Sequence, residues 1–322
     1  MLFEKQITNI YRRMAYTRCD ENKTAFYFSA DDFLGLNKES FVFKSSKNHD
    51  LQGYFYYYDN PISNRLIIFE HGFGGGHRSY MKEIEKLCKY GFKVFAYDHT
   101  GCMESGGENP NGMSQSLCDL NDCINALKNK LGYKAENISV IGHSWGGFST
   151  LNILSLHPQI SHIVVISGFV SVKMLIDSYF RGLLKFYRSS IMRIEENANP
   201  DFVNFNAIET LSKTDAKVLL IYSDNDKMCH KSVHYDALKE NLSNRENIEF
   251  ILTEEKGHNP NYTLDAVKYL GEYFRTKAKM TRKKLLTTDE DKEKFVASFD
   301  WNRMTEQDEE VWKKIFNHFE KV

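Results

Sequence analysis

A glycine-flanked serine is the strongest chemical signal in the sequence. The segment Gly142-His143-Ser144-Trp145-Gly146 follows an apolar strand-like run and opens a helix-like run. A strand–turn–helix of this kind is so tight that side chains at its flanking positions would collide with neighbouring backbone, and glycine removes that collision. The serine is then held in a strained conformation with its hydroxyl above the sheet edge. We therefore predict that Ser144 is a nucleophile and that the Trp145 N–H faces the reacting oxygen.

A serine nucleophile needs a base that accepts its proton. Among the eleven histidines, His258 lies in the loop after the last strand-like run, IEFILTE, at the edge where Ser144 is expected. His143 adjoins the nucleophile, but we expect the turn to point its ring elsewhere. His230 and His234 are four residues apart, a spacing that could suit a metal, although a solvent-facing surface is the simpler interpretation. The general base is therefore predicted to be His258.

The base needs an acidic partner that orients its ring. The loop after the strand-like run KVLLIYS offers Asp224 and Asp226. Asp226 lies deeper in the turn, before the apolar Met228, and is the preferred candidate. The other position available for the acid, after HIVVISG, has no nearby carboxylate. The order along the chain is then serine, acid, histidine, which predicts acyl transfer to water through an acyl-enzyme.

A glycine-rich segment could stabilise the charge that develops in such a reaction. The segment HGFGGG at 71–76 comes directly after the strand-like run RLIIFE. Free backbone N–H groups in a loop at this place can bind an oxyanion, and we predict that the Phe73 N–H is the second donor beside that of Trp145. A phosphate-binding loop is the alternative, but GFGGGHRS has neither the Lys-Ser/Thr nor the glycine spacing that such loops require.

Alternating strands and helices are expected to position these residues. Eight strand-like runs lie near 41–45, 51–58, 65–70, 92–98, 137–143, 162–168, 217–223 and 248–254. Amphipathic helical patterns separate most of these runs from residue 65 onward. Short apolar strands alternating with helices predict an α/β fold, with a mostly parallel eight-stranded sheet covered by helices on both faces.

Three segments go beyond this alternation. We expect a helical N-terminal extension over 1–40, a core over 41–280 and a helical C-terminal extension over 281–322. A helical cap is predicted at about 170–212, where the chain is longer than one crossover helix requires. The C-terminal extension carries an apolar stripe of Val311, Trp312, Ile315, Phe316 and Phe319. This stripe is expected to dock on the body, with a dimer contact as the alternative.

The cap is the expected source of substrate selectivity. Five of its apolar residues are candidates for the wall of an acyl or aromatic pocket: Tyr179, Phe180, Leu183, Phe186 and Tyr187. Basic side chains also gather in the cap. We interpret them as solvated, and a contact to a substrate carboxylate is the alternative hypothesis.

Composition narrows the functional classes. The 322 residues carry a formal net charge of -1, which provides no field that favours nucleic acid or an anionic membrane. The six cysteines form no Cys-x-x-Cys pair, so neither a zinc site nor a redox motif of that kind is expected. We recognise neither a secretory signal nor a membrane-spanning run, so the expected location is cytoplasmic. The predicted chemistry requires no metal and no other cofactor.

These motifs resemble those of the α/β-hydrolase superfamily. The resemblance is strongest to the capped serine hydrolases, which include monoacylglycerol-lipase-like esterases and a serine aminopeptidase-like group. It covers about residues 40–275 and rests on HGFGGG at 71–76, AYDHTGCMESGG at 96–107, GHSWGG at 142–147, YSDNDKM at 222–228 and KGHN at 256–259. It implies an α/β-hydrolase fold, in which Asp98, Gly101, Ser105 and Gly106 shape the loop after the fourth strand. Cys102 and Met103 depart from the usual glycine-rich pattern of that loop.

The expected function is that of a lipase-like serine esterase, which hydrolyses a carboxylic ester of a small or acyl-chain substrate. A peptidase or amidase, a thioesterase or an acyltransferase could use the same residues. A non-catalytic binding module is the alternative from another class, and the complete set of Ser144, Asp226 and His258 argues against it. The expected partner is therefore a small-molecule ester or acyl compound, and no nucleic acid. A homodimer through the cap or the C-terminal helix is the protein contact that we consider.

Overall fold

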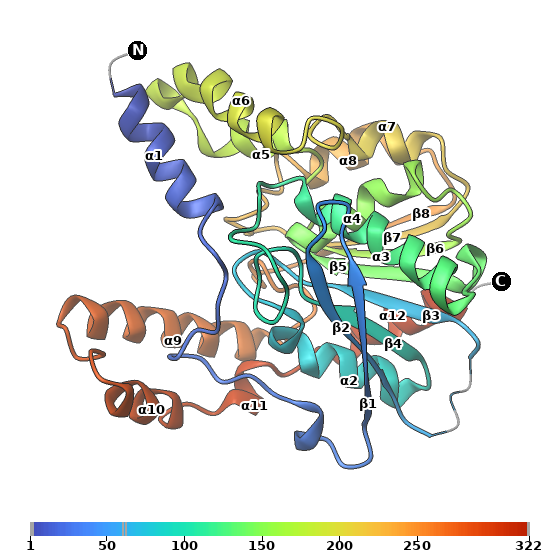
Figure 1. Cartoon of the computed structure of the whole chain (residues 1–322), viewed down its shortest axis with the longest axis horizontal. Coiled ribbons are helices and arrows are strands. Elements are labelled where there is room, and N and C mark those ends of the chain that lie inside the picture. The colour runs from blue at the N-terminus through green and yellow to red at the C-terminus, as the bar shows by residue number, and fades with distance from the viewer. Residues whose placement is uncertain (1–2, 60, 62, 321–322) are drawn as a thin grey trace.

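The centre of the computed structural model, which describes residues 3–59, 61 and 63–320, is one eight-stranded sheet (Figure 1). The strands are β1 (Asn37–Lys44), β2 (Asp50–Tyr57), β3 (Leu66–Glu70), β4 (Lys93–Tyr97), β5 (Ile138–His143), β6 (His162–Ile166), β7 (Lys217–Ser223) and β8 (Ile248–Thr253). Their spatial order is β1-β2-β4-β3-β5-β6-β7-β8. Strand β2 is antiparallel to both neighbours, and all other pairings are parallel. The predicted α/β class and mostly parallel sheet are confirmed.

The central strands are buried along their whole length because helices cover both of their faces. Every residue of β3, β5 and β6 is buried. Strands buried on both faces show continuous apolar runs rather than alternation. Edge strand β8 instead mixes buried and exposed positions. Sequence runs such as LIIFE and HIVVI therefore mark the middle of the sheet.

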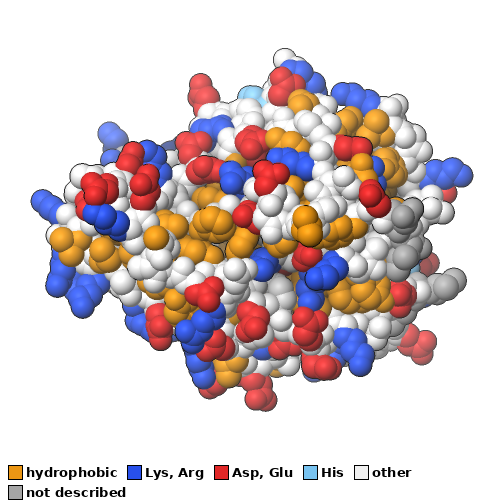
Figure 2. Space-filling view, turned by 90° about the horizontal axis from the view of Figure 1, so that it is seen from below, with side chains coloured by type: hydrophobic (Ala, Val, Ile, Leu, Met, Phe, Trp, Pro, Cys, Tyr) orange, Lys and Arg blue, Asp and Glu red, His pale blue; other side chains and the backbone are white. Residues whose placement is uncertain are grey.

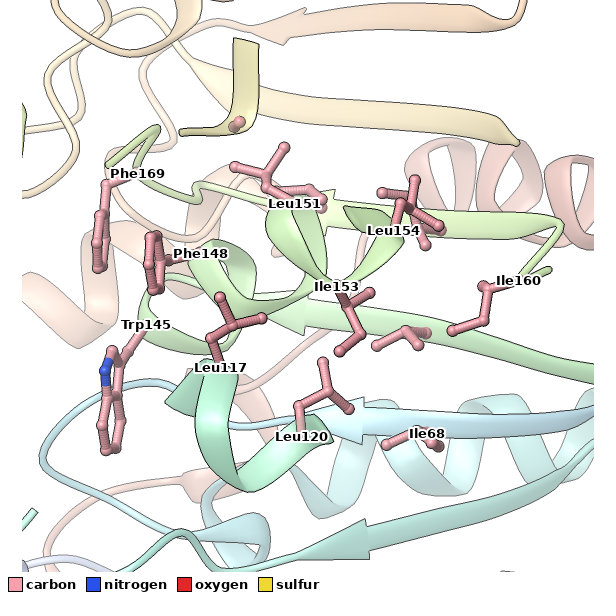
Figure 3. Close-up of a cluster of buried hydrophobic side chains, with 14 of the residues drawn as sticks. Ile68, Leu117, Leu120, Trp145, Phe148, Leu151, Ile153, Leu154, Ile160 and Phe169 are labelled. Carbon is pink, nitrogen blue, oxygen red and sulfur yellow. The ribbon is translucent and has the colours of Figure 1, made fainter. Parts of the chain in front are cut away.

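Two groups of helices cover the sheet and form two separate cores. Helices α3 (Gln115–Leu131), α4 (Trp145–Asn152), α7 (Ala207–Ser212) and α8 (Tyr235–Leu242) contribute to one core, and α2 (Met81–Tyr90) and α12 (Glu309–Glu320) contribute to the other. In the first core, Trp145, Phe148 and Phe169 lie in a row at one end, beside Leu117 of α3 (Figure 3). The rings of Phe148 and Phe169 stack with their centroids 4.7 Å apart. This aromatic row fixes the start of α4, which directly follows Ser144.

The cap contains α5 (Val172–Tyr179), a short 3-10 helix (Gly182–Tyr187) and α6 (Arg188–Ala198). Helix α7, at the end of the predicted cap range, contributes to the core instead. Helix α1 (Glu4–Ala15) lies beside α6, although α1 comes from the N-terminal end of the sequence, far from the cap segment (Figure 1). The cap layer is therefore assembled from two distant segments of the chain.

A buried carboxylate attaches α1 to the cap. Glu195 of α6 accepts hydrogen bonds from the hydroxyls of Tyr11 at 2.7 Å and Tyr16 at 2.9 Å, and from the Met113 N–H at 2.6 Å. Burial raises the pKa of Glu195 above its usual range. Three donors compensate the buried carboxyl group, because an unpaired one would be costly. This cluster joins α1, α6 and the segment before α3.

Helix α9 (Leu264–Arg282) ends the predicted core, and the C-terminal extension after it contains α10 (Asp289–Ala297), α11 (Trp301–Met304) and α12. Thr288 caps α10 in a reciprocal arrangement with Asp291. The face that includes this region carries interspersed acidic and basic side chains with apolar side chains between them (Figure 2). No helix within residues 3–59, 61 and 63–320 is long and apolar enough to cross a lipid bilayer.

Helix α12 packs its apolar stripe against the sheet, and Trp312 is its largest fully buried side chain. We expect Trp312→Ala to lower the free energy of unfolding by about 3–5 kcal/mol, because it leaves a cavity in a packed core. Urea denaturation followed by circular dichroism measures this loss. The exposed neighbour Lys313 provides the control, and Lys313→Ala should change stability by no more than about 0.5 kcal/mol. Equal effects of the two substitutions would contradict a structural role for this stripe.

Candidate active site

The turn between β5 and α4 holds Ser144 in a strained backbone conformation, with φ 56° and ψ -108°. The Ser144 N–H donates to the Ile166 carbonyl at 2.9 Å, which anchors the turn to β6. A Cβ atom at Gly142 would lie closer than 3.0 Å to the Gly146 carbonyl, and one at Gly146 would lie equally close to the Glu70 carbonyl. The steric reason given above for both glycines is thereby confirmed.

His258 and Asp226 are in direct contact at the ends of β8 and β7. Nδ1 of His258 lies 2.8 Å from Oδ2 of Asp226. The other oxygen, Oδ1, accepts the N–H groups of Met228 at 2.7 Å and Cys229 at 3.1 Å. Burial by itself would raise the pKa of Asp226, but these hydrogen bonds hold that pKa below its usual value. Asp226 is therefore ionised at neutral pH and can orient the imidazole of His258.

The alternative acid, Asp224, has a different structural role. Its carboxylate accepts the Glu255 N–H at 2.8 Å, and its own N–H donates to the Thr253 carbonyl. These bonds fasten the loop after β7 to the loop after β8. Of the two aspartates weighed from the sequence, Asp226 is the one that contacts His258.

Two residues, Cys229 and His143, lie between Ser144 and the pair of His258 and Asp226 as shared contacts. Its side chain hydrogen-bonds the thiol of Cys229, whose N–H donates to Asp226. The ring of His143 packs against that of His258 with the centroids 4.7 Å apart. All three candidate residues follow parallel strands of one sheet, and the carboxyl ends of such strands share one edge. Ser144, Asp226 and His258 are thus gathered at that edge.

A hydrogen-bonded chain through His143 was not foreseen from the sequence. The Gly72 N–H donates to the Tyr80 hydroxyl at 3.0 Å, and that hydroxyl lies 2.8 Å from Nδ1 of His143. The Tyr80 O–H therefore donates to Nδ1, which leaves the Nε2–H of His143 to donate to the His258 carbonyl at 2.7 Å. Burial lowers the pKa of His143 to about 3, which keeps the ring neutral in this arrangement.

The prediction that the His143 ring points away from the site is therefore wrong. The ring joins the glycine-rich loop to the loop of His258. Its position next to the nucleophile in sequence was the only signal available, since Tyr80 carries no motif of its own.

The two predicted oxyanion donors, Phe73 and Trp145, have unpaired N–H groups in the described part of the chain. Within residues 3–59, 61 and 63–320, neither the Phe73 N–H nor the Trp145 N–H has a hydrogen-bond acceptor. The Trp145 N–H is unpaired because it belongs to the first turn of α4, where helical N–H groups lack partners. Both residues line the same cavity as Ser144, and their rings contact each other with centroids 5.2 Å apart.

The cavity above Ser144 has a volume of about 500 Å³ and a mostly apolar wall. Of the five predicted cap residues, Tyr179 and Phe180 line it, whereas Leu183, Phe186 and Tyr187 do not. The side chain of Leu183 is 83% exposed, because the short 3-10 helix turns this part of the cap outward. Helix α1 supplies the missing part of the wall through Ile7, Ile10, Tyr11, Met14 and Ala15. Nothing in the sequence of α1 distinguished it from an ordinary docked helix.

His230 and His234 have different environments, because His230 is half-buried and His234 is not exposed at all. His234 is fully buried, and its Nδ1 accepts the Val170 N–H at 3.3 Å. The solvent-facing interpretation is therefore wrong for His234. In the described part of the chain, no group of three His, Cys, Asp or Glu side chains is arranged to hold a metal ion.

The loop after β4 supports the glycine-rich loop. Oδ1 of Asp98 accepts the His77 N–H and lies 2.8 Å from Nδ1 of the same residue. Burial by itself would raise the pKa of Asp98, but the contacts with His77 lower it to about 2. Ser105 accepts the Gln52 N–H at 2.9 Å and thereby ties the loop to β2. Asp98 and Ser105 thus shape this loop, as the resemblance implies.

Residues 65–188 match a family model described as the α/β hydrolase fold. The chain has the α/β-hydrolase fold. An esterase from Pyrococcus furiosus shares the fold of this α/β hydrolase, with a TM-score of 0.59 at 20% identity over 83% of this chain and 99% of that chain.

Curated relatives of this α/β hydrolase have several activities in their names. A proline iminopeptidase of Saccharolobus solfataricus is 28% identical over 47% of this chain and 50% of its own length. RutD of Serratia proteamaculans, provisionally named a carbamate hydrolase, is 31% identical over 34% of this chain and 39% of its own length. The chain thus spans half or less of the length of these relatives. Esters, amides and carbamates share a carbonyl carbon as the site of attack.

Proposed function

We propose that this α/β hydrolase cleaves carboxylic esters, with Ser144 as nucleophile, His258 as general base and Asp226 as the acid that orients it. The observation that carries the proposal is the 2.8 Å contact between His258 and Asp226, beside a serine strained at φ 56° on a glycine-flanked turn. A strained, partly exposed serine near an oriented imidazole is the arrangement that activates a hydroxyl for acyl transfer.

The reaction proceeds in two halves. Nε2 of His258 takes the proton of the Ser144 hydroxyl while the oxygen attacks the ester carbonyl carbon, and the Phe73 and Trp145 N–H groups stabilise the oxyanion. His258 then gives that proton to the departing alcohol, which leaves an acyl-enzyme on Ser144. In the second half a water molecule loses a proton to His258, attacks the acyl carbon and releases the carboxylic acid. Asp226 stabilises the imidazolium in both halves.

The cavity favours a substrate with an apolar acyl or aromatic part. At roughly 30 Å³ for each water-sized group, about 500 Å³ holds on the order of 15 non-hydrogen atoms. Ile7, Ile10 and Met14 of α1 provide one wall, and Tyr179 and Phe180 of the cap provide another. Such surfaces gain free energy by excluding water from an apolar chain. We therefore propose esters of intermediate acyl length as the substrate class.

Two measurements test this function. A fluorophosphonate probe should label the native protein, and peptide mapping should locate the label on Ser144. A series of nitrophenyl esters from acetate to palmitate should show the highest kcat/KM between butyrate and decanoate. Absence of labelling, or labelling at another residue, would contradict the nucleophile. Hydrolysis of aminoacyl nitroanilides but not of esters would select a peptidase instead.

A further inference from the structure

Two cysteines that are far apart in the sequence lie side by side next to the candidate active site. Cys19 and Cys102 pair in an isolated parallel bridge. The Cys19 N–H donates to the Gly101 carbonyl, and the Cys19 carbonyl accepts the Met103 N–H, both at 2.9 Å. Neighbouring extended segments lie about 4.8 Å apart. Since disulfides join Cα atoms roughly 4.4–6.8 Å apart, the backbone already holds this pair at a suitable separation.

The two thiols are in contact and differ in character. They hydrogen-bond to each other, and the Gly74 N–H donates to the sulfur of Cys19. The bond from Cys102 lowers the pKa of Cys19, although burial opposes this, and the Gly74 N–H lowers it further. The same bond raises the pKa of Cys102, and burial adds to that effect. Cys19 also has the more accessible side chain, since that residue is 8% exposed and Cys102 is fully buried.

The other four cysteines have a different environment. Cys88, Cys118, Cys123 and Cys229 are all buried, and burial raises the pKa of each thiol. Buried thiols with raised pKa values react slowly, because the thiolate is the nucleophile. The low pKa and the adjacent second thiol thus coincide at Cys19 alone among the six cysteines of the described chain.

We propose that Cys19 and Cys102 form an oxidation site, at which a hydroperoxide converts the two thiols into a disulfide. The Cys19 thiolate attacks one oxygen of hydrogen peroxide and breaks the O–O bond, which gives a sulfenic acid and, after protonation, one water. The sulfur of Cys102 then attacks the sulfur of Cys19 and expels the hydroxyl group, which leaves as a second water with the Cys102 proton. In total, two thiols are oxidised and one peroxide is reduced to two waters.

The position of this pair connects it to the cavity. Cys19 follows α1 by four residues, and α1 forms one wall of the cavity. Arg18 donates to the carbonyls of Gly107 and Ser105, so this stretch already rests on the loop after β4. A disulfide would make that attachment covalent. It would also draw the sulfur of Cys19 toward Cys102 and away from the Gly74 N–H, next to Phe73 of the proposed oxyanion site.

Peptide mapping of the native full-length protein tests the proposal without any activity assay. Purified protein is treated with a small excess of hydrogen peroxide, alkylated and digested without reduction. We expect a peptide that contains Cys19 linked to one that contains Cys102, lighter than the sum of both by two hydrogens, and restored to two alkylated peptides by dithiothreitol. The matched variant Cys88→Ala should form this link as wild type does, and Cys102→Ala should stop at a sulfenic acid on Cys19. Oxidation at other cysteines first, or a Cys19 that stays alkylatable when peroxide is in excess, would overturn the proposal.

A second readout rests on the proposed function. Oxidised protein should hydrolyse a butyrate ester several-fold more slowly than reduced protein, and dithiothreitol should reverse the loss, whereas Cys19→Ala should be insensitive to peroxide. If the protein hydrolyses no ester, the proposed function fails while the mapping result still decides the oxidation site. If hydrolysis is observed and no disulfide forms, the oxidation site fails and the proposed function stands.

Discussion

Ser144→Ala is expected to reduce kcat for ester hydrolysis by about a million-fold while the protein remains folded. The hydroxyl is the only group in the proposed mechanism that bonds to the substrate, and alanine removes it without adding volume. Alanine keeps a Cβ atom where the backbone has φ 56°, so we expect the strain of the turn to be unchanged. Hydrolysis of a chromogenic ester measures the rate, and circular dichroism verifies the fold.

A serine in the cap supplies a matched control for this experiment. The Ser178 hydroxyl donates to the Leu175 carbonyl at 2.7 Å, and Ser178 does not line the cavity. Ser178→Ala should therefore retain activity close to that of wild type. If Ser144→Ala kept activity within about tenfold of wild type, Ser144 would not be the nucleophile, since loss of that group costs far more.

Asp226→Asn is expected to lower kcat by about ten thousand-fold, an effect of the size known for the same change in other serine hydrolases. The Met228 and Cys229 N–H groups donate to Oδ1 and would hold the amide oxygen of asparagine in that place. The amide nitrogen of asparagine would then point at Nδ1 of His258. Nδ1 would have to accept a hydrogen bond from the amide N–H instead of donating one. The proton of the imidazole would move to Nε2, which could no longer take the proton of Ser144.

The neighbouring aspartate distinguishes this effect from a general loss of charge. Asp224→Asn removes one negative charge two residues away, but its carboxylate bonds the Glu255 N–H rather than His258. We expect this variant to keep most of its ester hydrolysis. If both variants lost ester hydrolysis equally, the negative charge of the loop would matter more than the orientation of the imidazole. A near-normal rate for Asp226→Asn would require another acid.

The parts of the site that were predictable depend on local constraints. The run LIIFE identifies β3 because a strand covered on both faces carries a continuous apolar run, here Leu66 to Phe69, rather than an alternating pattern. Gly142 and Gly146 could be interpreted because their backbone neighbours leave no room for a Cβ atom. Asp226 was preferred over Asp224 because Met228 suggested a buried turn; Asp226 is indeed buried, but Met228 itself is 52% exposed, so that signal was misleading.

The parts that were not predictable depend on contacts between distant segments. The apolar residues of the cap share one amphipathic pattern, which cannot tell Phe180, in the cavity wall, from Phe186, which is 56% exposed. Tyr80 and His143 are 63 residues apart, and no local pattern around either residue indicates the hydrogen bond between them. The contribution of α1 to the cavity likewise depends on its attachment to Glu195.

The attachment of α1 to Glu195 separates the residues that shape the cavity from those at the edge of the sheet. The candidate catalytic residues lie at the edge of the sheet, whereas a large share of the cavity wall comes from α1, which is attached to the cap by hydrogen bonds to Glu195. Grafting a different leading helix onto Glu195 would reshape the cavity without disturbing a single strand. We therefore expect substitutions in α1 alone to change which substrates fit the cavity.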